Sequence, residues 1–234
     1  MKLRFFFLLL AALTGLAALH PTAPALDGAW RQINAPAGHT FVLTLADGYA
    51  METTFEPSRF LGSRGGPVRV EGSSIALNVE FDTRDSARVG QTETQPMTLQ
   101  AARLTLGKAI YERLDEPSAQ TPLAGLWRIT GREGENGQVN AMQRGDRKTI
   151  KLLTGTRFQW AAINPKTRQF SGTGGGTYTL KDGKYAETID FFSRDNSRVG
   201  RSLSFDCELS GDTWRHRGQS STGGKVSEVW SRER

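Results

Sequence analysis

Few residues in this chain could carry out chemistry. It has three histidines and one cysteine among 234 residues. His20 follows the apolar N-terminal run and His39 stands in a Pro- and Gly-containing loop, so only His216 falls in a strand-like segment. A hydrolase needs a nucleophile, a base and an orienting acid, and no Gly-x-Ser-x-Gly segment supplies a nucleophile. We therefore predict no catalytic residues.

Metal and phosphate sites are not indicated either. No HExxH, His-x-His or paired cysteines occur, and a structural zinc site needs four such ligands. The glycine-rich segment 172–176 lacks a following Lys-Ser/Thr pair, so it is typical of a tight loop between strands. Cys207 alternates with Leu203, Phe205 and Leu209, as a buried thiol would. We expect no metal and no cofactor.

The best enzymatic alternative is a paired-carboxylate glycosidase that uses Glu187 with Glu228 or Asp190. Successive strand residues point to opposite faces, so Asp190 and Glu187 should face opposite ways. This parity counts against that pair, and the sequence favours a binding protein over an enzyme.

An internal repeat organises the chain, and such repeats decide the architecture. Near the start of each half, Leu26, Gly28 and Trp30 recur as Leu123, Gly125 and Trp127. Arg84, Asp85, Arg88, Val89 and Gly90 recur as Arg194, Asp195, Arg198, Val199 and Gly200. The repeat predicts two domains, 26–114 and 122–234, joined by a polar, proline-containing linker at 115–121.

Each half reads as a series of short strands separated by turns. Runs rich in β-branched and aromatic residues, such as 41–45, 75–81 and 185–192, alternate with Asp-Gly and Gly-Gly turn signals. Beyond the N-terminal segment, no window shows helical periodicity. We therefore predict an all-β protein in which each half is an antiparallel barrel or sandwich.

The Gly-x-Trp near the start of the first strand, with an Arg at the end of the last, resembles the lipocalin and wider calycin barrels. The second half also resembles a family of exported bacterial lipocalin-like domains of unknown function, through Tyr178, Tyr185, Glu187, Trp214, His216 and the closing segment 228–232. The resemblance implies two tandem antiparallel lipocalin-like β-barrels and a habit of binding small molecules. It also implies that one end of each barrel is closed by a Trp–Arg pair, namely Trp30 with Arg113 and Trp127 with Arg232.

The N-terminal segment 1–25 has the features of a signal peptide. Lys2 and Arg4 precede an apolar run, and Ala23 and Ala25 offer a cleavage site. An uncleaved anchor is the alternative, but the run is short for a bilayer span. We expect an exported bacterial protein, periplasmic or secreted, without stable membrane insertion after cleavage. The net charge is +6, but the basic residues are interspersed with acidic ones and form no basic stripe. We therefore expect no nucleic-acid partner.

The repeat also predicts which half holds a pocket. One face of the first half is apolar and should point inward, and its counterpart in the second half adds a tyrosine and a carboxylate. These faces are Ile75, Leu77, Val79 and Phe81 in the first half and Tyr185, Glu187, Ile189 and Phe191 in the second. Other positions diverge in the same direction: Val68, Leu104 and Leu106 against Tyr178, Trp214 and His216. Aromatic walls with a few polar groups are typical of small-molecule sites.

We therefore predict that the second barrel binds a hydrophobic or amphipathic small molecule, through Trp160, Tyr178, Tyr185, Glu187, Trp214 and His216. Two interpretations of Glu187 and His216 stay open: they anchor the ligand, or they satisfy each other as a buried pair. The rings could equally be core packing. The alternative function is a structural or interaction module of the cell envelope, with both barrels filled.

Overall fold

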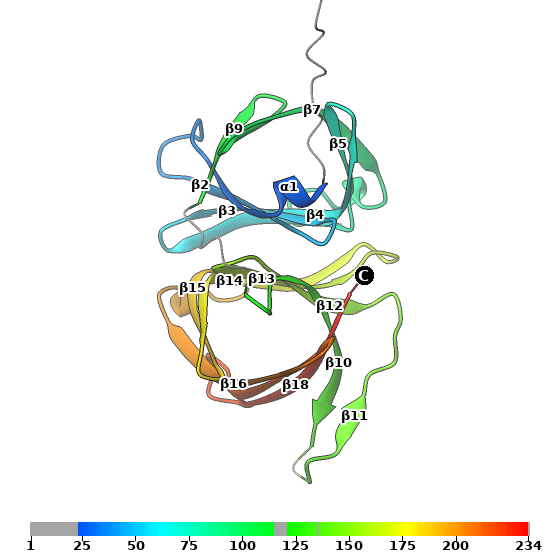
Figure 1. Ribbon diagram of the computed structural model, residues 1–234, viewed down its shortest axis with the longest axis vertical. Helices are drawn as coiled ribbons and strands as arrows, with labels where there is room; N and C mark the ends of the chain where they lie inside the picture. Colours follow the sequence, from blue (N-terminus) through cyan, green and yellow to red (C-terminus); the bar gives the residue numbers. More distant parts are fainter. Residues whose placement is uncertain (1–22, 115–120, 135, 234) are drawn as a thin grey trace, which may run out of the picture.

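The computed structural model describes residues 23–114, 121–134 and 136–233. This part is almost all β-structure and forms two closed eight-stranded antiparallel barrels in tandem (Figure 1), which confirms the predicted fold class. Most of the predicted signal peptide (residues 1–22) and of the predicted linker (115–120) lies outside the described residues. No helix in the described ranges has the length and apolar character needed to span a bilayer.

In the first barrel, neighbouring strands pair antiparallel in the order β3-β2-β1-β9-β8-β7-β5-β4, and β3 pairs with β4 to close the ring. A four-residue helix, α1, precedes it, and a two-residue strand, β6, pairs with β4. The bounds are α1 Ala23–Leu26, β1 Gly28–Gln32, β2 Thr40–Ala46, β3 Tyr49–Glu56, β4 Arg59–Glu71, β5 Ser74–Asn78, β6 Phe81–Asp82, β7 Thr92–Gln100, β8 Arg103–Leu106 and β9 Ala109–Arg113.

In the second barrel the ring runs β10-β12-β13-β14-β15-β16-β17-β18, and β10 pairs with β18 to close it. A short strand, β11, extends β10 into a hairpin that projects away from the barrel (Figure 1). The bounds are β10 Gly125–Glu133, β11 Val139–Ala141, β12 Lys148–Leu153, β13 Arg157–Asn164, β14 Gln169–Lys181, β15 Lys184–Phe192, β16 Ser202–Ser210, β17 Thr213–Gln219 and β18 Lys225–Arg232.

A tryptophan and an arginine meet at one end of each barrel. Trp30 is fully buried, and its Nε1 donates to the carbonyl oxygen of Leu26 at 2.9 Å. The Arg113 guanidinium lies 4.0 Å from the Trp30 ring centroid, a cation–π distance. The second barrel repeats these contacts with Trp127 Nε1 bonded to the Leu123 carbonyl oxygen at 2.8 Å and Arg232 at 4.4 Å from the Trp127 ring.

The barrels pack face to face through β2, β3, β4 and β6 of the first and β12 to β15 of the second (Figure 1). Ile150 and Leu152, on the outer face of β12, are fully buried with Tyr49 and Met51 in one apolar cluster. Outer faces that would meet water in a lone barrel are therefore apolar here.

A buried polar network lies within this interface. The Gln159 Oε1 accepts from Thr53 Oγ1 at 3.0 Å, and its Nε2 donates to Ser63 Oγ at 2.9 Å and to Thr173 Oγ1 at 3.1 Å. All four residues are buried. Buried polar groups with every partner in place fix one relative arrangement, because any shift leaves them unsatisfied.

The prediction that Phe191 shares the inward face of Tyr185, Glu187 and Ile189 is wrong. Gly176 pairs with Ile189 and Gly175 with Phe191, so Asp190 is an extra residue in a β-bulge. A bulge reverses the in–out alternation beyond it. Phe191 therefore packs outward on Phe55 of the first barrel, with ring centroids 5.3 Å apart.

The same expectation is wrong for Phe81 in the first barrel. Its ring stacks outward on Phe170 of the second barrel, with centroids 6.2 Å apart. The two phenylalanines therefore belong to the contact between the barrels and not to either interior.

Asp27 gives the fold a testable pH dependence. Burial and the nearby charge of Asp47 raise the pKa of its carboxyl from 3.8 to about 6, against the pull of Arg113. The folded state then holds the proton more tightly than the unfolded chain does. The stabilisation from this group is complete at low pH and is lost as the pH rises through about 6.

We expect Asp27→Asn, which mimics the protonated carboxyl, to raise the urea midpoint at pH 7 and to change it little at pH 4. The exposed turn residue Asp182 offers the matched control Asp182→Asn. Equal changes in the two variants, or an unaltered pH dependence in Asp27→Asn, would contradict this expectation.

Candidate functional site

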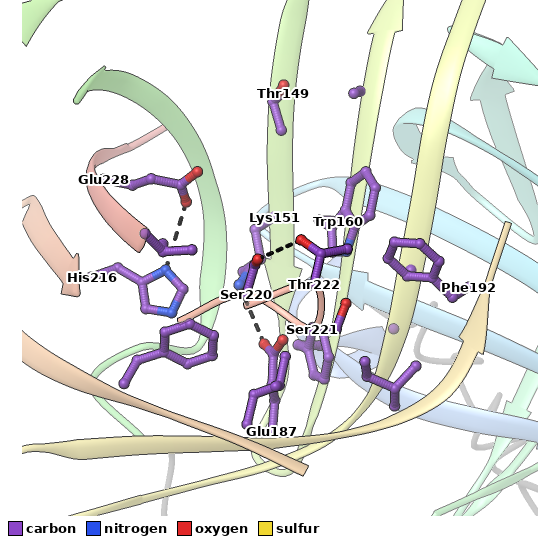
Figure 2. A pocket seen from close by; sticks show the side chains of 18 of the residues that line it. Thr149, Lys151, Trp160, Glu187, Phe192, His216, Ser220, Ser221, Thr222 and Glu228 are labelled. Atoms are coloured by element: carbon purple, nitrogen blue, oxygen red, sulfur yellow. Dashed lines mark hydrogen bonds and ion pairs between the residues drawn. The ribbon is translucent and has the colours of Figure 1, made fainter. Parts of the chain in front are cut away.

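The second barrel encloses a cavity of about 370 Å³. Its wall comes from the seven strands β12 to β18, and the exposed residues Arg132 of β10 and Arg194 lie at its rim. Figure 2 shows ten of the lining residues labelled. The first barrel has two smaller spaces instead. The inner one is about 30 Å³, is bounded mainly by aliphatic side chains and leaves room for about one water molecule; the other, about 210 Å³, has a polar lining that includes Glu52, Arg64 and Asp82. The two interiors have therefore diverged in both volume and chemistry.

Aromatic rings form one side of this cavity. Trp160 and Phe192 make an edge-on contact at 5.8 Å and both line the wall. They lie against Gly174, where a Cβ would come within 2.8 Å of each ring. Glycine at this point of β14 therefore makes space for both rings.

A buried ion pair forms the floor. Lys151 of β12 is 4% exposed and Glu187 of β15 is 8% exposed. The Lys151 Nζ lies 3.5 Å from the Glu187 Oε2, as the dashed line in Figure 2 marks. Two charges at such burial require each other, because an unpaired buried charge is costly.

His216 and Glu228 lie on the neighbouring part of the wall, with Nδ1 and Oε2 3.6 Å apart (Figure 2). Burial lowers the pKa of His216, so its imidazole is neutral at pH 7. Burial alone would raise the pKa of Glu228, but His216 and the ammonium of Lys151 lower it overall. Glu228 is therefore a carboxylate at neutral pH.

Several polar atoms here have no hydrogen-bond partner. Among the described residues, the buried side-chain atoms that meet no partner at hydrogen-bond geometry are the Tyr185 hydroxyl, Glu187 Oε2, Trp214 Nε1 and both ring nitrogens of His216. All belong to the second barrel, and two of the four side chains line its cavity. Polar neighbours still interact with three of these side chains: Glu187 with Tyr185, Cys207 with Trp214 and Glu228 with His216. Buried polar atoms are normally hydrogen-bonded, so the atoms of Glu187 and His216 on the cavity wall can accept a further partner, either water or a ligand.

A loop between β17 and β18 crosses the mouth. Ser220, Ser221 and Thr222 line the cavity there (Figure 2). The Ser221 carbonyl oxygen accepts from Arg198 Nη1 at 2.5 Å and from Arg201 Nη1 at 3.1 Å. In the first barrel the corresponding turn joins β8 and β9 directly, without such a loop.

The structure brings three of the six predicted binding residues to the cavity: Trp160, Glu187 and His216. The other three, Tyr178, Tyr185 and Trp214, are buried in the apolar cluster of the same barrel and do not line the cavity. The Tyr178 hydroxyl is satisfied by the Thr154 carbonyl oxygen at 2.6 Å. Glu187 and His216 are not each other's ion-pair partners: Glu187 pairs with Lys151, and His216 faces Glu228.

Sequence reasoning missed Lys151. It stands in the run Thr149 to Leu153, where alternation puts it opposite Ile150 and Leu152. A strand with isoleucine and leucine on one face and lysine on the other normally buries the aliphatic face. Here the aliphatic face is covered by the first barrel, so the lysine points into its own barrel. No local signal could have found it.

Two features named in the sequence, the glycosidase alternative and the repeated Arg-Asp segment, lie away from the cavity or at its rim. Asp190, the glycosidase alternative, pairs with Arg157 at 3.0 Å as the extra residue of the bulge. Asp195 caps a short turn by accepting from Ser197 N at 3.0 Å, so this Arg-Asp segment is built as a turn. No cluster of three or more metal-ligating side chains occurs within the described ranges.

Comparisons with known proteins name no function. No family model and no curated protein matches the chain. Among solved structures, it is similar to an uncharacterized protein from Bacteroides eggerthii, at 16% identity and a TM-score of 0.33. That match covers 47% of this chain and 98% of the other.

Proposed function

We propose that this protein is exported and binds a small, partly apolar ligand in the second barrel, without catalysing a reaction. The observation that carries the proposal is a cavity of about 370 Å³ whose wall includes the buried side chains of Glu187 and His216, each with polar atoms that make no hydrogen bond. A buried polar group without a partner costs about 1–3 kcal/mol. A molecule that supplies the missing partners therefore gains binding free energy.

The size and lining of the cavity support a small ligand. Its volume is near the lower end of the range for small-molecule sites, and at roughly 30 Å³ per water-sized group it holds about a dozen such groups. Apolar walls with a few polar groups suit a molecule with one apolar and one polar end.

The alternative, a structural or interaction module with filled barrels, is favoured for the first half only. The apolar part of its interior is nearly full, and one of its outer faces is covered by the second barrel. We propose that the first barrel supports the second one and holds no ligand.

Ala162 of β13 lines the cavity, so Ala162→Phe should fill it. We expect native mass spectrometry of the mature chain to find a small molecule bound to the wild type and to find at least a tenfold loss of occupancy in Ala162→Phe. The matched control is Ala186→Phe, which adds the same ring on the face of β15 opposite to Glu187 and the cavity. This variant should keep the ligand. An empty wild type whose melting temperature no amphipathic molecule raises would contradict the proposal.

A further inference from the structure

Lys151 occupies an aromatic cage made by its own barrel. Its Nζ lies 5.4 Å from the ring centroid of Phe158, 5.1 Å from Tyr185, 5.3 Å from Trp214 and 5.5 Å from Trp230. Rings within about 6 Å of a cation attract it. The place that would receive a cationic ligand is therefore already taken by the protein's own ammonium group.

The charges on the cavity wall favour an anion. Three cations line it, Lys151, Arg132 and Arg194, against the two carboxylates Glu187 and Glu228. Both arginines are exposed at the rim. A cleft with an excess of one charge concentrates ligands of the opposite charge.

Lys151 also has unused hydrogen-bonding capacity. An ammonium group has three N–H donors, and among the described residues this one makes a single ion pair at 3.5 Å and no hydrogen bond. Above it, Trp160, Phe192 and Leu203 give the wall an apolar surface towards the mouth. The cavity thus has on its floor an ion pair whose ammonium keeps free N–H donors, and an apolar passage above it.

We infer that the ligand is a small amphipathic carboxylate. Its anionic group binds the Lys151 ammonium on the floor, and its apolar part lies along Trp160 and Phe192. This inference rests on the proposed function and specifies the class of its ligand.

The test compares ligands that differ only in the head group. Octanoate, octanol and octylamine are titrated into the mature full-length chain by calorimetry at pH 7, and naphthylacetate, naphthylethanol and naphthylethylamine provide a second set of another shape. We expect the carboxylate of at least one set to bind at least about tenfold more tightly than its alcohol, with the amine weakest, because a charge-assisted hydrogen bond is the stronger kind.

Two variants locate the head group. In Lys151→Met/Glu187→Gln, which removes both charges of the floor, we expect the preference for carboxylate over alcohol to disappear while the alcohol still binds. The matched rim variant Arg132→Gln should keep the preference within about threefold. A preference lost in Arg132→Gln and retained in the floor variant would overturn the inference, because the head group would then lie at the mouth.

The outcomes separate this inference from the proposed function. If an alcohol or amine binds as tightly as the carboxylate and Ala162→Phe abolishes that binding, the cavity binds ligands and the carboxylate assignment is wrong. If no member of either set binds the wild type, the inference is overturned as well, and co-purification alone then decides whether the cavity holds some other ligand.

Discussion

Lys151→Met is expected to destabilise the protein by about 3–5 kcal/mol, the usual result of removing one partner from a buried ion pair. The Lys151 and Glu187 side chains are 5% and 10% exposed. Methionine preserves the length and packing of the lysine stem, so the loss isolates the charge. What remains is a buried carboxylate whose Oε2 has no hydrogen bond.

The companion variants show whether the loss comes from the pair. Glu187→Gln alone should also destabilise, because it removes the ion-pair partner of the ammonium and leaves only the rings and the more distant Glu228. Lys151→Met/Glu187→Gln should recover most of the loss, since neither charge is then left buried alone.

Urea denaturation with a fitted m-value gives the free energies. The control is Lys184→Met, which breaks the exposed pair of Lys184 with Asp206 and should scarcely move the midpoint. A Lys151→Met protein as stable as the wild type would show that the floor tolerates an unpaired carboxylate, and the assigned geometry of the pair would be wrong.

The second large effect is expected at the bulge of the second barrel. A Cβ on Gly176 would lie 1.9 Å from the Thr188 carbonyl oxygen and 2.8 Å from the Asp190 backbone nitrogen. Both obstacles are backbone atoms, which no change of rotamer can move aside. We expect Gly176→Ala to cost at least about 3 kcal/mol, at the upper end of overpacking effects.

The first barrel contains the equivalent test. A Cβ on Gly66 would lie 1.8 Å from the Asn78 carbonyl oxygen, so Gly66→Ala should be comparably destabilising. Gly145, with nothing within 4 Å of its Cβ position, supplies the control Gly145→Ala, which should be nearly neutral. If thermal melts gave Gly176→Ala the same melting temperature as Gly145→Ala, β14 and β15 would not be as close at the bulge as described.

Much of the fold could be predicted from sequence because its signals are local. Short alternating strands, Asp-Gly turns and a repeat of Gly-x-Trp anchors each depend on neighbours along the chain. Alternation, together with the comparison of matching positions in the two halves, predicted Trp160, Glu187 and His216 in the interior of the second half, and all three line the cavity. It could not separate them from Tyr178, Tyr185 and Trp214, because depth along a barrel axis depends on the shear of the closed sheet.

By itself, then, the sequence determined two related antiparallel barrels with chemically different interiors. Only the tertiary structure decided that the barrels dock, and docking supplied what local patterns could not. The first barrel covers Ile150 and Leu152 on the outer face of β12, so Lys151, on the opposite face, points inward and pairs with Glu187. Phe191, which follows the bulge in β15, packs outward on Phe55 of the first barrel. The physical reason is that the residues of a strand show which of its two faces is apolar. Which surface covers that face depends on residues distant in the chain.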